Sequence, residues 1–170
     1  VGFYTFIKYR LKALQKENLI LEQKVAERTF ELEEQSKIIV QKNKDITDSI
    51  SYASKIQHAI LPASGLIKTH LPQSFVLYMT KDIVSGDFYW ATLHKDRFYF
   101  AVCDSTGHGV PGALLRVLGH GIIEELIEEK NLVSPSNIIN ELNNQLNLAF
   151  STEKLTEYGI ELSVMCFNDG

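Results

Sequence analysis

The chain has 170 residues, of which 45% are hydrophobic and 22% are charged, the composition of an ordinary soluble protein. This length fits one domain with an appendage. The net charge of −4 gives no basic surface, so the chain is not expected to bind nucleic acid. Its two cysteines, Cys103 and Cys166, lie far apart in apolar runs and indicate reduced core thiols, as in a cytoplasmic protein, rather than a disulfide framework or a zinc site.

The first residues of the chain combine an apolar segment with basic residues. Residues 1–7 (VGFYTFI) are apolar, and four basic residues follow between positions 8 and 16. Seven residues cannot cross a bilayer, since a spanning helix needs about 20. Residues 1–10 nevertheless fit the end of a transmembrane helix with a basic cytoplasmic flank. The other interpretation is an amphipathic start of the next helix, so we expect a cytoplasmic protein or the cytoplasmic part of an inner-membrane protein.

A long helix is predicted over residues 11–61, because positions 11–60 contain neither Gly nor Pro and carry an unbroken heptad. Its d positions turn polar from Arg28 to Ser49, whereas its a positions are apolar except Asn18. A single Asn at an a position favours a parallel two-stranded coiled coil. We therefore expect a parallel homodimer that relays a signal from an upstream sensor; the alternative is a long helix packed on its own domain. The a positions are Leu11, Asn18, Val25, Leu32, Ile39, Ile46, Ala53 and Ile60.

Two aspartates flank a predicted β-hairpin. Residues 88–90 (FYW) and 97–102 (RFYFAV) are rich in aromatic and β-branched residues, and the polar residues 94–96 between them fit a turn. In an antiparallel pair the start of the first strand lies beside the end of the second, so Asp87 and Asp104 are expected to meet. Two carboxylates placed together repel unless one is protonated or a cation lies between them. The pattern therefore indicates a site for a hard divalent cation.

A glycine-rich loop, STGHGVPG at positions 105–112, follows Asp104. Its three glycines allow unusual backbone angles, so the loop can bring main-chain groups close to a metal ion or a phosphate. The motifs SGDFYW and AVCDSTGHGVPGALL, with SYASKIQHAILP upstream, resemble the SpoIIE-like family of bacterial type 2C (metal-dependent) serine/threonine protein phosphatases. The resemblance runs from about Ser51 to the C-terminus.

This resemblance implies a two-metal Mn²⁺ or Mg²⁺ centre with Asp87 and Asp104 as carboxylate ligands and the main-chain carbonyl of Ser105 as a further ligand. It also implies hydrolysis of phosphoserine or phosphothreonine on a partner protein, typically an anti-sigma-factor antagonist. His108 is a candidate general acid for the departing oxygen, since His titrates near neutral pH; a hydrogen bond within the loop is its other role. The family's remaining metal-binding aspartates have no counterpart here, and Asp169 does not match their motif, so we expect a fragment that lacks the C-terminal part of the phosphatase domain.

The remaining patterns predict an α+β fold. A turn-rich link at 62–74 leads to a first strand at 75–79 (FVLYM), and apolar stripes predict helices at 112–129 and from Ser134 onward. A last strand is predicted at 160–167. Strands, two helices and a strand indicate a layered sandwich, and the resemblance implies that 75–170 is the N-terminal part of an α-β-β-α phosphatase domain.

Two other classes of function stay open. One is a catalytically silent dimeric relay, in which the sandwich only docks a partner and metal is dispensable. The other is a histidine-kinase-like dimerisation segment with His58 as the phosphoacceptor. The residues after His58, Ala59 to Pro62, lack the acidic residue that normally follows such a histidine, so this hypothesis is the weaker of the two.

Overall fold

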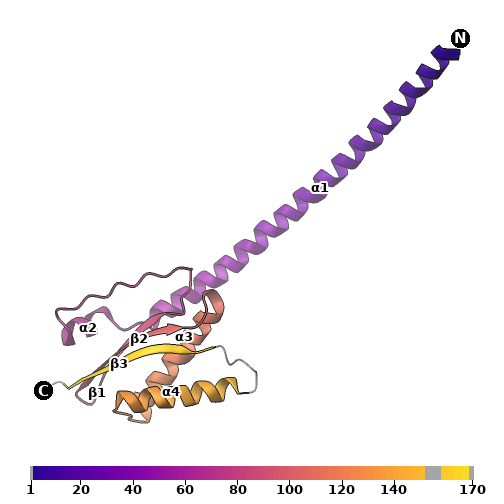
Figure 1. The fold of residues 1–170 in the computed structure, drawn as a ribbon. Helices are drawn as coiled ribbons and strands as arrows, with labels where there is room; N and C mark the ends of the chain where they lie inside the picture. The colour runs from indigo at the N-terminus through magenta and orange to yellow at the C-terminus, as the bar shows by residue number, and fades with distance from the viewer. Residues whose placement is uncertain (1, 152–157, 169–170) are drawn as a thin grey trace. The chain divides into compact units, whose positions relative to one another are not determined.

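The computed structural model describes residues 2–151 and 158–168; Val1, residues 152–157 and residues 169–170, with Asp169 among them, lie outside the described part. The chain divides into two units, Val1–Asp48 and Ser49–Gly170, which are described separately. The described elements, in chain order (Figure 1), are α1 (Gly2–Ala59), α2 (Ser64–His70), β1 (Phe88–His94), β2 (Arg97–Ser105), α3 (Gly109–Glu124), the π-helical turn η1 (Glu125–Glu129), α4 (Pro135–Phe150) and β3 (Ile160–Asn168).

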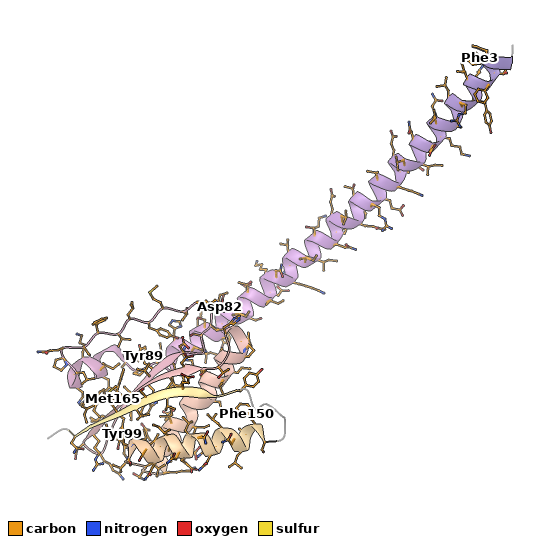
Figure 2. All side chains as sticks on the ribbon, viewed as in Figure 1. Phe3, Asp82, Tyr89, Tyr99, Phe150 and Met165 are labelled. Atoms are coloured by element: carbon orange, nitrogen blue, oxygen red, sulfur yellow. The ribbon has the colours of Figure 1, made fainter. Side chains whose placement is uncertain are left out.

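The first unit consists of α1 up to Asp48, a single helix whose side chains project on all sides (Figure 2). The apolar a positions in this unit are between 54% and 64% exposed. Surface pairs such as Arg28 with Glu31, at 2.7 Å, support the helix by only a few tenths of a kcal/mol each, on the order of 0.2–0.5. A single copy of the helix therefore leaves its apolar seam in water. No helix among the described residues is both long and apolar enough to cross a membrane.

The second unit is built on an antiparallel sheet with the strand order β1-β2-β3. Lys95 and Asp96 connect β1 to β2 with positive φ values of 48° and 61°, which suits a two-residue hairpin turn. The ladder pairs Phe88 with Cys103 at one end and His94 with Arg97 at the other. The predicted hairpin and the predicted last strand are therefore both present.

Helices α3 and α4 and the turn η1 cover one face of the sheet, and their apolar side chains form the main core with those of the strands. Burying one such side chain contributes about 1.5–3 kcal/mol. The thiol of Cys103 belongs to this core, and burial raises its pKa to about 12, so it is uncharged at neutral pH. On the opposite face, Ile67 of α2 packs against Ala91 and Phe98. The α+β class predicted from the sequence is confirmed.

Three local predictions were wrong. Residues 75–79 have no regular secondary structure, although their residue types favour a strand. A strand requires a neighbour to pair with, and this segment pairs with none of the described strands. Residues 64–70 of the predicted link form α2, and the helix predicted from 112 begins three residues earlier, at Gly109.

Candidate metal centre

Asp87 and Asp104 meet at one end of the hairpin. Asp87 directly precedes β1, and Asp104 is the penultimate residue of β2. Because Phe88 pairs with Cys103, the next position outward on each strand holds an aspartate. The two carboxyl groups are close enough for Asp104 to raise the pKa of Asp87. The structure thus shows the predicted proximity, while the role of the pair as metal ligands stays a prediction.

The charge of this pair is unfavourable without a counter-ion. Partial burial of the Asp87 carboxyl raises its pKa, and the hydrogen bond with Asp104 and the charge of Asp104 raise it further. The guanidinium of Arg116 acts in the opposite direction and lowers the pKa of Asp87. A divalent cation between the two carboxylates would remove the repulsion.

The loop after Asp104 packs so tightly on the strand end that two of its contacts require glycine. A Cβ atom on Gly86 would lie 3.0 Å from the carbonyl oxygen of Ser105 and 3.2 Å from that of Gly107. A Cβ atom on Gly112 would lie only 2.5 Å from the same Gly107 oxygen. Gly107 itself has a φ of 92°, which a side chain would disfavour. These contacts place the loop carbonyls and the start of α3 directly against Gly86, the residue before Asp87.

Ser105, whose carbonyl is the further ligand that the resemblance implies, is only 2% exposed. Its carbonyl oxygen faces the Gly86 backbone, as the short approach above shows. Its hydroxyl is buried and has no hydrogen-bond partner among the described residues. The residue is thus fixed by packing rather than by its side-chain polarity.

His108 is the residue immediately before α3, and its side chain is exposed. Its Nδ1 lies 3.2 Å from the Oδ2 of Asp82. Because both side chains are exposed, an ion pair between them contributes at most about 1 kcal/mol. The partner lies 26 positions away and outside the glycine-rich loop, so this contact is not the hydrogen bond within the loop that the sequence suggested, and the role of His108 as general acid stays a prediction.

The main chain of Asp87 is held at both of its polar groups by residues that the sequence reasoning missed. The Asp87 amide donates to Ser85 Oγ at 3.1 Å. The Asp87 carbonyl accepts from Tyr78 Oη at 3.1 Å and from Arg116 Nη1 at 3.4 Å. A lone cation inside the apolar run ALLRVL was the signal in the sequence that could have singled out Arg116.

A third carboxylate residue, Glu161, faces Asp104 across the ladder between β2 and β3. Directly paired residues project from the same face of a sheet, so Glu161 belongs to the face that carries the aspartates. Among the described residues, however, no group of three His, Cys, Asp or Glu side chains is close enough to hold a metal ion. The centre as described therefore supplies two carboxylates, Asp87 and Asp104.

The available donors fit part of the implied metal centre. Carboxylate and carbonyl oxygens are the ligands that Mg²⁺ and Mn²⁺ prefer, whereas zinc prefers Cys and His. Asp87 and Asp104 would hold the metal and the Ser105 carbonyl would lie beside it, but three ligand groups do not complete the coordination of two cations. The donor set thus fits the chemical type of the implied metal and provides only some of its ligands.

Comparison with known proteins identifies the architecture. The sequence profile of the family described as stage II sporulation protein E (SpoIIE) matches residues 94–167. Eleven chains of solved structures match this one. One of them is the SiaA-PP2C domain of Pseudomonas aeruginosa, with 33% sequence identity and a TM-score of 0.65 over 75% of this chain. Together these two similarities support a fragment of a SpoIIE-like PP2C domain.

These similarities bear out the resemblance predicted from the motifs around Asp87 and Asp104. The matched region covers 50% of the SiaA-PP2C chain, so the present chain spans half the length of that solved domain. A comparison with curated proteins found no match. The SpoIIE-like chain described here therefore carries part of a PP2C domain together with the long helix α1.

Proposed function

We propose that the complete protein hydrolyses phosphoserine or phosphothreonine on a partner protein in a reaction that depends on Mn²⁺ or Mg²⁺. The observation that carries this proposal is the meeting of Asp87 and Asp104 at the hairpin end of a SpoIIE-like PP2C domain. The proposed class of substrate is a phosphorylated anti-sigma-factor antagonist, as the family resemblance implies.

In this proposal each residue of the site has one task. Asp87 and Asp104 bind the cations through their carboxylates, and Ser105 contributes its main-chain carbonyl. The bound cations would lower the pKa of a water molecule and stabilise the charge that develops as it attacks phosphorus in line. His108 would donate a proton to the departing serine or threonine oxygen. No covalent phosphoenzyme is required.

Replacing Asp104 by alanine in the complete protein is expected to lower the rate of phosphate release from a phosphoserine peptide at least about 100-fold. Replacing a residue that only hydrogen-bonds to a metal ligand already lowers metal affinity or activity by about 10–100-fold, and Asp104 would be a ligand itself. Turnover is measured with Mn²⁺, with Mg²⁺ and after chelation. Asp96→Asn is the matched control, because Asp96 lies at the other end of the same hairpin and Asn tolerates its positive φ.

Two results would contradict the phosphatase proposal. One is full turnover in Asp104→Ala, and the other is turnover that persists after chelation. Absence of turnover with any divalent ion, in a complete protein that is folded and dimeric, would favour the catalytically silent relay instead.

We also propose that α1 forms a parallel homodimer that couples the PP2C domain to an upstream sensor. The support is the exposed apolar seam, in which Val25 is 58% and Leu32 is 64% exposed on a single copy. A second copy would bury this seam by knobs-into-holes packing. The apolar seam and Asn18 together favour two strands in parallel.

The double variant Val25→Lys with Leu32→Lys is expected to be monomeric in sedimentation equilibrium at concentrations where the unchanged protein is dimeric. Two ammonium groups at a positions cannot be buried in a two-stranded seam without a large desolvation penalty. The control is Gln23→Lys with Ala26→Lys, which adds the same charge at heptad positions f and b, outside the seam. An unchanged protein that is monomeric, or a control that dissociates equally, would rule out the proposed seam.

A further inference from the structure

Asp82 and His108 join the two loops that also carry the aspartates of the candidate site. Asp82, labelled in Figure 2, lies in the loop that leads to Asp87, and His108 lies in the glycine-rich loop that follows Asp104. The Nδ1 of His108 is 3.2 Å from the Oδ2 of Asp82, within hydrogen-bond distance. Because the two residues are 26 positions apart, the fold of the domain brings them together rather than local chain geometry.

The main chain, rather than the contact itself, places the two side chains. Val84, two residues after Asp82, is only 3% exposed and anchors its loop in the domain. A Cβ atom on Gly86 would lie 3.2 Å from the carbonyl oxygen of Gly107, so the loop of Asp82 packs directly on the residue before His108. The carboxylate and the imidazole therefore face each other at the edge of two packed loops.

The two ring nitrogens of His108 have different surroundings. Nδ1 faces Asp82, and because an ionised carboxylate can only accept, Nδ1 carries the proton in this hydrogen bond. Nε2 has no hydrogen-bond partner among the described residues. The side chain of His108 is 78% exposed, so Nε2 is open to a substrate.

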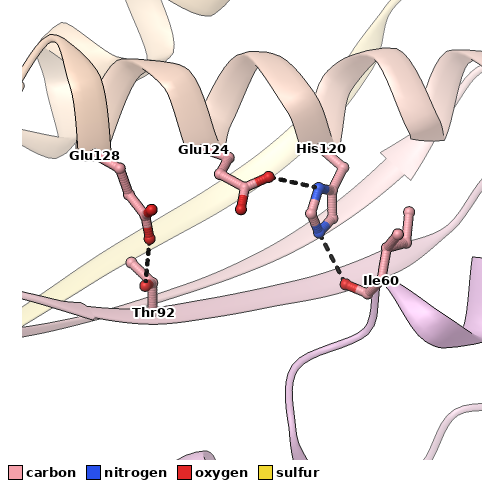
Figure 3. A network of polar contacts seen from close by, with 5 residues as sticks. All are labelled: Ile60, Thr92, His120, Glu124 and Glu128. Atoms are coloured by element: carbon pink, nitrogen blue, oxygen red, sulfur yellow. Dashed lines mark hydrogen bonds and ion pairs between the residues drawn. The ribbon is translucent and has the colours of Figure 1, made fainter.

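His120 has a similar carboxylate neighbour but no open nitrogen. Its Nδ1 lies 3.7 Å from Glu124 Oε2, and its Nε2 donates to the carbonyl of Ile60 at 2.9 Å (Figure 3). Its side chain is only 13% exposed. His120 is thus engaged within the domain, whereas His108 combines a held Nδ1 with a free Nε2.

We propose that Asp82 is a positioning residue for His108: its carboxylate holds the Nδ1–H group, so that Nε2 is the nitrogen that delivers a proton to the departing serine or threonine oxygen. Which nitrogen of a histidine carries a proton is set by the hydrogen bond that the other makes. This inference rests on the proposed phosphatase function. Asp82 acts only through His108.

The proton transfer balances without a further reactant. The oxygen of the attacking water forms a new bond to phosphorus and releases its proton to solvent. The bond from phosphorus to the serine oxygen breaks, and its electron pair stays on that oxygen. The Nε2–H bond of the doubly protonated His108 ring breaks as the serine O–H bond forms. The neutral ring keeps its other proton on Nδ1, still donated to Asp82, and solvent returns a proton to Nε2.

The test uses two substrates whose leaving groups differ in their need for a proton. A serine alkoxide leaves poorly unless it is protonated, whereas p-nitrophenolate leaves as a stable anion. The pair of Asp82 with His108 is exposed and contributes at most about 1 kcal/mol, so Asp82→Asn is expected to fold normally. Asp96→Asn is the matched control, since it makes the same chemical change at an exposed residue in the hairpin turn.

In the complete protein, Asp82→Asn is expected to lower kcat for a phosphoserine peptide about 10-fold, a part of the 10²–10⁴-fold that a positioned general acid contributes. The asparagine amide can turn its NH₂ group toward Nδ1, which favours the wrong tautomer of His108. Turnover of p-nitrophenyl phosphate should stay within about twofold. His108→Gln should show the same selectivity with a larger loss, and adding Asp82→Asn to it should cost nothing more, because Asp82 acts only through His108. Asp96→Asn should change neither rate.

Each failure has its own signature. Equal losses on the two substrates in Asp82→Asn would overturn the positioning role, since a disturbed site slows both reactions. Unchanged peptide turnover in Asp82→Asn, or a further loss when it is added to His108→Gln, would also overturn it. Metal-dependent turnover of the peptide that survives His108→Gln would leave the phosphatase proposal intact and overturn the roles of both residues. Absence of turnover in the unchanged protein would overturn the phosphatase proposal and this inference with it.

Discussion

Replacing Gly112 by alanine is expected to destabilise the second unit by about 3 kcal/mol, the upper range for a group forced into packed surroundings. The added Cβ would lie 2.5 Å from the carbonyl oxygen and 3.0 Å from the carbonyl carbon of Gly107. Both atoms belong to the main chain, so no side-chain rotation can relieve the contact. The loop between Asp104 and α3 must shift instead, which should also weaken Mn²⁺ binding. Equilibrium unfolding in urea measures the loss as a lower midpoint at an unchanged slope.

Gly121→Ala is the matched control, because Gly121 lies in the same helix and a Cβ there would meet no atom within 4 Å. Alanine is the better helix former by about 1 kcal/mol, so this variant should be slightly more stable than the unchanged protein. Equal stability of the two alanine variants would show that the close approach of Gly107 to Gly112 does not exist in solution.

The variant Leu142→Ala is expected to lose about 2–5 kcal/mol, the range for truncating a buried leucine. Leu142 is 1% exposed on α4, where it belongs to the core between the helices and the sheet. Its loss removes apolar contacts and leaves a cavity that the rigid sheet cannot close. Leu148→Ala makes the same chemical change in the same helix at a side chain that is 73% exposed, and it should shift stability by less than about 0.5 kcal/mol.

Thermal and urea unfolding of the two variants measure this difference directly. A loss at Leu148 as large as that at Leu142 would mean that the outer side of α4 is covered in the complete protein.

The sequence was informative where structure depends on neighbouring residues. The aromatic and β-branched residues on both sides of the polar residues 94–96 were enough to predict the hairpin and the meeting of Asp87 with Asp104. The observed pairing of Phe88 with Cys103 places these two aspartates side by side. The long helix followed equally directly from fifty positions without Gly or Pro.

The sequence was not informative where structure depends on distant partners. Residues 75–79 have strand-like composition, but composition cannot say whether an edge is available for pairing. In the sequence Gln57 cannot be distinguished from the other polar residues of a solvent-exposed helix. Its contact with Ser85, 28 positions away, is seen only in the structure. Arg116 was an anomaly in an apolar helix, and only the folded chain shows that its partners come from Tyr78, Gln57 and Asp87.

The strand order β1-β2-β3 also sets an order of assembly. The hairpin joins adjacent residues and can form within microseconds, whereas β2 must wait for residues 160–168, which the ribosome makes only after α3 and α4. Until then the outer edge of β2 presents unpaired main-chain groups beside Phe98 and Phe100, the kind of edge that pairs with other chains. If α3 packs against the hairpin early, the flexible loop between β2 and β3 becomes shorter. Less conformational entropy is then lost when β3 pairs with β2. Until β3 pairs with β2, the nascent chain is thus open to aggregation at this edge.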